Sequence, residues 1–247
     1  MWPIETLAII TAAFLLAGAV KGVVGLGLPT VSLALLTASL GLKDAMALML
    51  VPSFVTNLWQ GAVGGAAGPI LRRIWTLLLA ACLGTWFGAG VLARADALLL
   101  SGLFGLILCA YSLFSLMTPQ IPPPGRREPW LSPLVGAVSG VVTGLTGSFV
   151  VPGVLYLQAL GLPRDVLVQA MGITFTTATV ALALSLSAHD LLPLDLGLLS
   201  ALALAPAALG MLLGQSVRRR LPEARFRRVF FGALLVLGVY IVARALV

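Results

Sequence analysis

Ten apolar stretches occupy most of this 247-residue chain and constrain its fold more than any other feature. Only 9% of the residues are charged, against about 25% in soluble proteins, so there is too little polar surface to cover a water-soluble fold. The stretches also lack the polar–apolar alternation of transmembrane β-strands. We therefore expect an all-α polytopic membrane protein rather than a secreted module, a disordered regulator or a cytosolic enzyme. The stretches run over residues 4–24, 28–41, 45–65, 70–93, 97–117, 131–142, 149–160, 166–188, 195–217 and 229–247.

The lengths of these stretches predict breaks in the helical framework. A helix needs about 20 residues to cross a hydrocarbon core of about 30 Å, and seven of the ten stretches meet or approach that length. The stretches at 28–41, 131–142 and 149–160 do not, and they adjoin glycine-rich sequence. We expect short broken or re-entrant helices at 22–41 and 131–160.

A polar, proline-rich linker at 118–130 divides the chain near its centre, and the two parts repeat each other. Three consecutive prolines in this linker cannot continue a helix. Residues 18–24 match residues 136–142 at six of seven positions, and further matching blocks follow at offsets of 120 and 121. Three collinear blocks indicate an internal duplication. We expect a first transmembrane repeat at 1–117 and a second at 131–247.

The basic residues lie near the ends of the apolar stretches and give the two repeats opposite orientations. Because the net charge of +7 is not gathered on one polar face, we expect no nucleic-acid partner. Arg72 and Arg73 fall in an expected loop whose equivalent in the second repeat carries His189 and acidic residues. With the 118–130 linker in the cytoplasm, 11 basic residues lie inside and both termini face out. Inverted repeats recur in secondary transporters, which bind solute near the midplane where broken helices meet.

The pattern contains no arrangement of residues typical of catalysis or metal binding. The single histidine, His189, lies in an expected outer loop, and Cys82 and Cys109 lie inside apolar stretches without metal-ligand spacing. No nucleotide-binding loop or soluble catalytic domain is present. We therefore expect a protein that is not an enzyme and that has no cofactor. The first apolar stretch has no basic segment before it, so we expect it to be retained rather than cleaved as a signal peptide.

Two glycine-rich breaks are the best candidates for a binding site. The first reads Gly-Val-Val-Gly-Leu-Gly-Leu-Pro-Thr at 22–30, and the second reads Thr-Gly-Leu-Thr-Gly-Ser at 143–148. Glycines allow a tight turn that exposes backbone N–H groups, and a helix that starts after the turn adds its positive dipole end, so an anion can bind there. The alternative is that the glycines only allow close helix packing. We favour binding for the two breaks and packing for Gly84, Gly88 and Gly90.

Polar side chains inside the apolar stretches complete the candidate site. Lys21 could extend to the inner interface or supply a counter-charge for the anion, and both interpretations stay open. Ser53 and Thr56 share a helix face, as do their partners in the second repeat, although each hydroxyl could instead bond its own helix. Gln60 and Gln169 are weaker candidates. The anion is expected between the two repeats, and the candidate substrate-binding residues are Lys21, Gly25, Gly27, Thr30, Ser53, Thr56, Asn57, Thr143, Gly144, Thr146, Gly147, Ser148, Thr174 and Thr177.

Three motifs occur together in this chain: the break at 22–30, the apolar-Gly-Leu turns followed by Asp at 40–44 and 160–165, and Asn-Leu-Trp-Gln at 57–60. In these motifs the chain resembles the sulfite exporter TauE/SafE family of membrane permeases. The resemblance spans the whole chain, since both halves carry a version of the pattern. It implies transport of small sulfur-containing anions, such as sulfite, a sulfonate or sulfoacetate, across the bacterial cytoplasmic membrane.

These expectations combine into one functional hypothesis. The chain is expected to be a secondary transporter in the bacterial inner membrane, and its partners are the lipid bilayer, a small anionic substrate and a coupling ion, either H+ or Na+. An anion channel and a structural membrane subunit are the alternatives. Inverted repeats with broken helices favour a carrier over a channel. The sequence leaves open the direction of transport and the oligomeric state.

Overall fold

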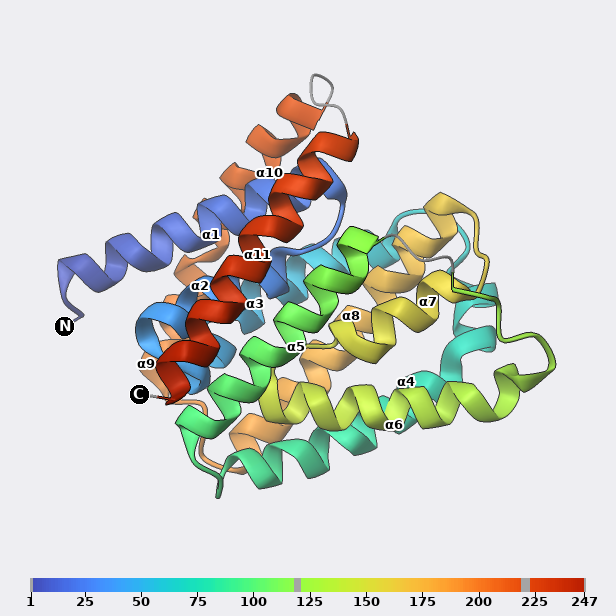
Figure 1. Ribbon diagram of the computed structural model, residues 1–247, viewed down its shortest axis with the longest axis horizontal. Coiled ribbons are helices and arrows are strands. Elements are labelled where there is room, and N and C mark those ends of the chain that lie inside the picture. The colour runs from blue at the N-terminus through green and yellow to red at the C-terminus, as the bar shows by residue number, and fades with distance from the viewer. Residues whose placement is uncertain (1, 118–120, 219–222, 247) are drawn as a thin grey trace. The chain divides into compact units, whose positions relative to one another are not determined.

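A computed structural model describes residues 2–117, 121–218 and 223–246 of the chain (Figure 1). Every regular element in these residues is helical, as the sequence predicts. The first three linker residues, 118–120, lie outside the described residues, as do Arg219 and Arg220, two of the basic residues expected in the cytoplasm. The helices are α1 Ile4–Val24, α2 Leu28–Leu40, α3 Leu42–Ala62, α4 Ala67–Leu92, α5 Ala97–Met117, α6 Glu128–Thr146, α7 Leu155–Ala159, α8 Arg164–Ala188, α9 Leu194–Leu202, α10 Leu204–Arg218 and α11 Glu223–Leu246, with a 3-10 turn η1 at Gly125–Arg127 and a π-helical turn η2 at Val150–Val154.

Seven helical segments of the described chain are long and apolar enough to cross a membrane. The all-α polytopic membrane fold is thereby confirmed. Two shorter apolar helices, α2 and the segment Val150–Ala159, lie where the sequence predicts breaks. The seven segments are Ile4–Val24, Ala67–Leu92, Ala97–Met117, Gly125–Thr146, Arg164–Ala188, Leu194–Ser216 and Phe226–Leu246.

One expectation about an individual stretch is wrong. The stretch at 131–142 belongs to the full-length helix α6 rather than to a short helix. Pro129 lies in the first turn of α6, where a missing N–H costs nothing. The helix therefore begins within residues 118–130, whose composition predicts a linker. Helix α3 covers residues 45–62 of the stretch at 45–65 and has 21 residues, the length expected, although it is not one of the seven segments selected by length and hydropathy. Polar residues in its second half, such as Asn57 and Gln60, lower its hydropathy.

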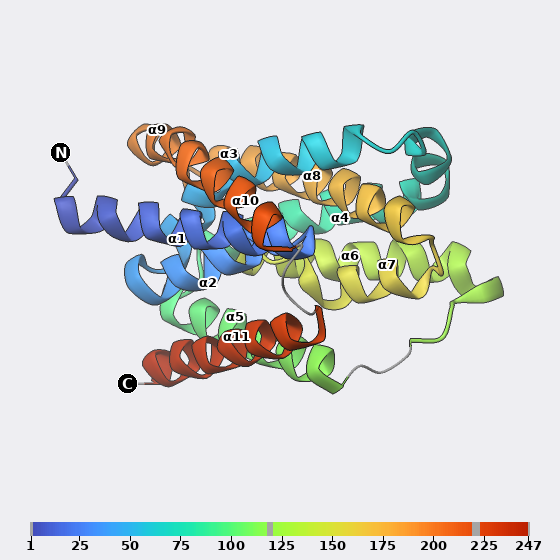
Figure 2. The ribbon, with the colours of Figure 1, turned by 90° about the horizontal axis from the view of Figure 1, so that it is seen from above.

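The helices form two compact units, and each unit draws on both halves of the sequence. The first unit comprises Met1–Pro52, Asp96–Pro119 and Pro193–Val247, and the second comprises Ser53–Ala95 and Gln120–Leu192. Within the first unit, α1 packs against α2 and α10, and α5 packs against α11 (Figures 1 and 2). Within the second unit, α4 packs against α6 and α8. The repeats at 1–117 and 131–247 do not coincide with these units and stay a prediction.

Glycines allow the closest helix pairs in both units. A Cβ atom on Gly22 of α1 would overlap the backbone carbonyl oxygen of Met211 on α10. In the second unit, a Cβ atom on Gly144 of α6 would overlap the carbonyl oxygen of Thr85 on α4. These helices pack backbone to backbone, as small residues allow in membranes. The packing role expected for Gly84 and Gly88 is confirmed. The same kind of contact occurs at Gly18, Gly84, Gly88, Gly136, Gly140, Gly210 and Gly214.

These contacts relate the two halves of the chain in a register that the sequence alignment misses. Gly22 and Gly144 lie 122 residues apart. Their partners, Met211 for Gly22 and Thr85 for Gly144, lie 126 residues apart. The alignment of residues 18–24 with 136–142 has an offset of 118, which differs from 122 by four residues. Four residues make about one helical turn, and glycines recur at that spacing. Because glycines repeat every four residues in both helices, the sequence aligns almost as well when one helix is shifted by one turn.

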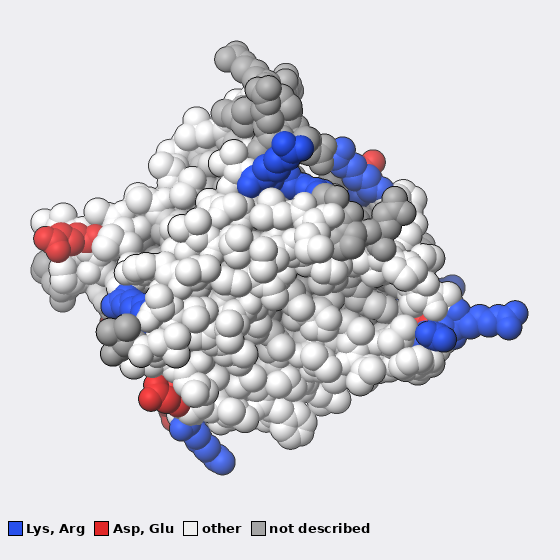
Figure 3. All heavy atoms as spheres, in the orientation of Figure 1, with Lys and Arg blue, Asp and Glu red and all other residues white. Residues whose placement is uncertain are grey.

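Many large apolar side chains are exposed, as expected for a chain surrounded by lipid. On the face seen in Figure 3, the charged residues form small, separate groups on an otherwise uncharged surface. Aromatic and aliphatic side chains are exposed along the long helices, and such extensive apolar exposure indicates contact with a bilayer. Examples include Trp59, Trp75, Leu83, Phe87, Leu99, Leu184 and Val236.

Candidate functional site

The first break lies between α1 and α2 in the first unit. Helix α1 ends at Val24, and Gly25 follows in the left-handed conformation with φ 85°. The Gly25 N–H donates to the Lys21 carbonyl at 2.7 Å, which closes the last turn. Gly27 has φ 106° and precedes α2, whose first turn contains Pro29. Both glycines adopt backbone conformations that other residues rarely adopt, so the turn depends on them.

The second break, between α6 and η2 in the second unit, begins in the same way. Helix α6 ends at Thr146, Gly147 has φ 75°, and its N–H donates to the Thr143 carbonyl at 2.7 Å. Gly25 and Gly147 are therefore equivalent helix-ending residues, again 122 positions apart. Beyond the break the backbones differ. The η2 turn contains the extended residue Val151, with φ −119° and ψ 128°, whereas α2 is a regular helix.

Lys21 is the buried charged residue at the first break. Its side chain is only 4% exposed, although it lies one turn before the end of α1. A lysine that extends to the interface keeps its ammonium group in water, which this burial does not favour. A charge inside a membrane protein is costly and usually marks a functional site. The burial does not fit an interfacial anchor, and the interpretation of Lys21 as a counter-charge for an anion stays a prediction.

The threonines of the candidate site bond their own helices. Thr143 Oγ1 donates to the Ser139 carbonyl at 2.7 Å, and Thr146 Oγ1 donates to the Val142 carbonyl at 2.7 Å. On α8, Thr174 Oγ1 donates to Ala170 O at 2.8 Å and Thr177 Oγ1 to Ile173 O at 3.0 Å. A hydroxyl has one hydrogen, so each of these groups retains only acceptor capacity. An anion needs donors, and these four threonines do not offer them in this conformation.

Two serines differ from the threonines in this respect. Ser53 Oγ on α3 and Ser139 Oγ on α6 are buried, and neither has a hydrogen-bond partner within the part of the chain that the structure describes. An unsatisfied buried hydroxyl is costly and needs an explanation, such as a ligand that binds there. The sequence identified Ser53 through its position in the repeat. It missed Ser139, whose only signal was being the single mismatch in the first repeated block.

The remaining candidate residues are also buried. Thr30 lies in the first turn of α2 and is 8% exposed. Thr56 and Asn57 follow Ser53 on α3 and are 5% and 1% exposed, and Ser148 at the second break is 5% exposed. Gly144 packs α6 against α4, as described above, so it has a structural role at the edge of the second break.

Two glutamines join α3 to α8 within the second unit. Gln60 Nε2 donates to the Val168 carbonyl at 2.8 Å, and Gln169 Nε2 donates to the Gly61 carbonyl at 3.0 Å. Gln169 Oε1 also accepts from the Ala66 N–H at 3.0 Å. These bonds use both ends of the Gln169 amide, which makes it a structural residue rather than a ligand-binding one.

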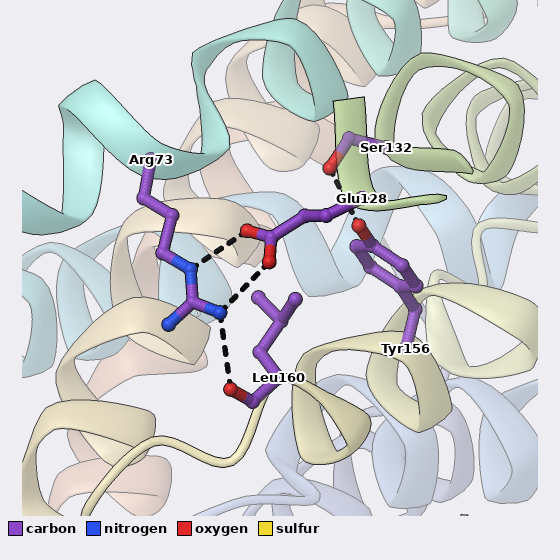
Figure 4. A network of polar contacts seen from close by, with 5 residues as sticks. All are labelled: Arg73, Glu128, Ser132, Tyr156 and Leu160. Carbon is purple, nitrogen blue, oxygen red and sulfur yellow. Dashed lines mark hydrogen bonds and ion pairs between the residues drawn. The ribbon is translucent and has the colours of Figure 1, made fainter. Parts of the chain in front are cut away.

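A polar network fixes the end of the short helix α7 in the second unit (Figure 4). Arg73 forms a bidentate ion pair with Glu128 of α6, at 2.7 and 2.9 Å, and donates to the Leu160 carbonyl at 3.1 Å. Beside it, the hydroxyls of Ser132 and Tyr156 lie 2.6 Å apart. Arg73 is part of α4 and not of a loop, which corrects the expectation for Arg72 and Arg73.

Long apolar helices and an apolar surface define a multi-pass membrane protein, in which two glycine-bounded breaks carry buried polar groups. Among the described residues, no three His, Cys, Asp or Glu side chains are grouped as a metal site would require.

The chain belongs to the sulfite exporter TauE/SafE family, because the model of that family matches residues 10–241, nearly the whole chain. The resemblance seen in the sequence motifs is thereby confirmed. No curated protein and no solved structure matches the chain.

Proposed function

We propose that the protein is a secondary transporter that moves a small sulfur-containing anion across the bacterial cytoplasmic membrane by alternating access. Membership of the sulfite exporter TauE/SafE family supports the class of substrate, which we take to be sulfite, a sulfonate or sulfoacetate. The coupling ion is H+ or Na+. Discontinuous helices at equivalent positions of two repeats are typical of secondary transporters and support a carrier.

The observation that carries this proposal is the buried Lys21 beside the break between α1 and α2. A buried ammonium group is poorly solvated, so an anion that reaches it gains a strong charge-assisted hydrogen bond. The N–H groups at the start of α2 add donors and a positive helix dipole. We assign Lys21, Gly25, Gly27 and Thr30 to the anion site. In the second unit, the buried Ser53 hydroxyl is a separate candidate donor, because it has no hydrogen-bond partner in the described chain.

Transport by purified protein in liposomes tests the proposal. Uptake of labelled sulfite should saturate, and unlabelled sulfite trapped inside should drive uptake by counterflow. A channel would give uptake without counterflow, and a structural subunit would give neither. A thermal-shift panel of sulfite, thiosulfate, sulfonates, sulfate and carboxylates then identifies the preferred anion, and imposed H+ or Na+ gradients identify the coupling ion.

The inverted arrangement of the repeats is tested by topology. Single cysteines at Ile121 and Leu191, in a chain whose Cys82 and Cys109 are replaced by alanine, should react with an impermeant thiol reagent from opposite sides of the membrane. Reaction from the same side would contradict inverted repeats and remove the main structural argument for alternating access.

A further inference from the structure

Helix α3 contains a proline in its middle that interrupts its hydrogen bonding. Pro52 lies 10 residues after the first residue of α3, Leu42. Proline has no N–H, and its ring displaces the carbonyl four residues earlier, which here belongs to Leu48. Proline inside a helix is a common cause of a bend, and the backbone atoms that it frees need another partner.

Ser200 of α9 supplies that group. Its hydroxyl donates to the Leu48 carbonyl at 2.7 Å and accepts from the Val51 N–H at 3.0 Å. The side chain is 1% exposed, so water does not compete for these bonds. One hydroxyl thus bridges a backbone donor and a backbone acceptor on the turn before Pro52. Alanine at position 200 could do neither, whereas threonine retains the hydroxyl.

This bridge lies where the chain passes from one compact unit to the other. The first unit includes α3 as far as Pro52, and the second begins at Ser53. At the two other described crossings, after Ala95 and after Leu192, the chain is not helical. Among the described points where the chain passes between the units, the one at Pro52 therefore lies inside a helix, α3. The candidate site residues Ser53, Thr56 and Asn57 follow directly.

We propose that Ser200 is a positioning residue that holds the bend of α3 at Pro52, and that this bend is the hinge on which the transport cycle depends. The second half of the inference rests on the proposed transport function. Movement of α3 at Pro52 requires the two bonds of Ser200 to break and form again. The bond to the Leu48 carbonyl is buried and the bond from the Val51 N–H is partly buried, so losing them is costly. Without the hydroxyl, α3 returns to the bent state less often.

A double-mutant cycle with hydrogen–deuterium exchange tests the hinge without any transport assay. The four proteins are the wild type, Ser200→Ala, Pro52→Ala and the double variant, and the measurement is deuterium uptake by a peptide that covers residues 48–52. Ser200→Ala should speed exchange of the Val51 amide about tenfold when Pro52 is present. It should have no effect in the Pro52→Ala background, because an alanine N–H restores the helical ladder.

The transport assay separates a positioning role from general destabilisation. In Ser200→Ala, the rate of sulfite counterflow should fall about tenfold while the sulfite concentration for half-maximal thermal shift stays unchanged. Ser200→Thr should keep wild-type rates. Ser112→Ala is the matched control, since Ser112 is equally buried in the first unit but bonds only to Leu108 of its own helix.

The outcomes distinguish the two proposals. Equal exchange effects of Ser200→Ala in the wild-type and Pro52→Ala backgrounds, or no effect in the wild-type background, would overturn the inference. So would an unchanged counterflow rate in a protein that transports sulfite. If the wild type transports no sulfite, the proposed function fails, and the exchange cycle still decides whether Ser200 holds the bend. If Ser200→Ala alone does not fold, recovery of folding in the double variant supports the bridge, and its absence contradicts it.

Discussion

The two breaks of this protein have the same backbone device but different chemistry. At both, a helix ends one residue before a glycine with positive φ, whose N–H donates to the carbonyl four residues earlier at 2.7 Å. That carbonyl belongs to Lys21 at the first break and to Thr143 at the second. The helix-ending glycine is therefore common to both breaks, whereas the buried lysine of the first break is a threonine at the second. On the proposed function, this difference predicts that the first break contributes more to anion recognition.

The largest effect should come from the glycines that bring helices together in each unit. Gly22→Ala and Gly144→Ala would each force a Cβ atom against a backbone carbonyl, of Met211 and Thr85 respectively, and backbone cannot move aside as a side chain can. We expect each variant to lose about 3 kcal/mol of stability or to fail to accumulate. The measurement is the unfolding temperature in detergent.

A matched glycine should behave in the opposite way. Gly232 lies inside α11, and no atom would contact its Cβ within 4 Å. Gly232→Ala should therefore gain about 0.5–1 kcal/mol from the reduced backbone entropy of the unfolded chain. Wild-type stability of Gly22→Ala or Gly144→Ala would show that the two helix pairs are not packed backbone to backbone.

The next effect concerns binding and compares Lys21 with Thr143, the equivalent residue of the other break. Lys21→Met keeps the length of the side chain and removes its charge, and we expect sulfite affinity to fall about 10- to 100-fold. Thr143→Val should change affinity less than about twofold, because its hydroxyl hydrogen is already bonded to Ser139. Sulfite affinity by isothermal titration checks both. Equal losses would mean that the two breaks contribute equally to recognition.

How much of this could be predicted from the sequence depends on the range of the interaction. The breaks at Gly25 and Gly147 were predictable because glycine acts on its own backbone. The start of α6 was not, since Pro129 is compatible with both a linker and a first helical turn. The bonds of Ser200 to α3 join residues about 150 positions apart, and no local pattern indicates them. Likewise, whether a buried hydroxyl bonds its own helix depends on its rotamer, which separates Thr174 from Ser53 although the sequence pairs them.

That pair provides the third test. Thr174→Val removes a hydroxyl already bonded to Ala170, so we expect little change in sulfite affinity. Ser53→Ala removes a buried hydroxyl that has no partner within the described residues. It should stabilise the protein by about 1 kcal/mol and weaken sulfite binding about five- to tenfold. Unfolding temperature and titration together decide, since an unchanged affinity in Ser53→Ala would exclude this hydroxyl from the site.

The smallest effects should come from the arginines that bond the ends of the two short helices. In the second unit, Arg73 donates to the carbonyl of Leu160, just after α7, and is held by its ion pair with Glu128. In the first unit, Arg244 of α11 donates to the carbonyl of Ala38 near the end of α2. A cation at a helix end is favourable in both cases because the last carbonyls carry partial negative charge. The difference is the carboxylate, which fixes the Arg73 side chain in place.

We expect Arg73→Ala to cost about 1 kcal/mol of stability and Arg244→Ala about half of that. Both side chains are exposed, Arg73 to 39%, but Arg73 forms a bidentate ion pair, whereas Arg244 makes one bond to α2. Salt should weaken the ion pair of Arg73.

Raising ionic strength from about 0.1 M to about 1 M shortens the screening length from about 10 Å to about 3 Å, so it should reduce the stability that is lost in Arg73→Ala. Glu128→Gln should reproduce most of the Arg73→Ala loss at low salt, since it leaves the guanidinium without its partner. Unfolding temperatures of the three variants at both salt concentrations provide the measurement. Should Arg244→Ala prove as costly as Arg73→Ala, the end of α2 would depend on its arginine as strongly as the end of α7, and the two short helices would differ only in the chemistry of their breaks.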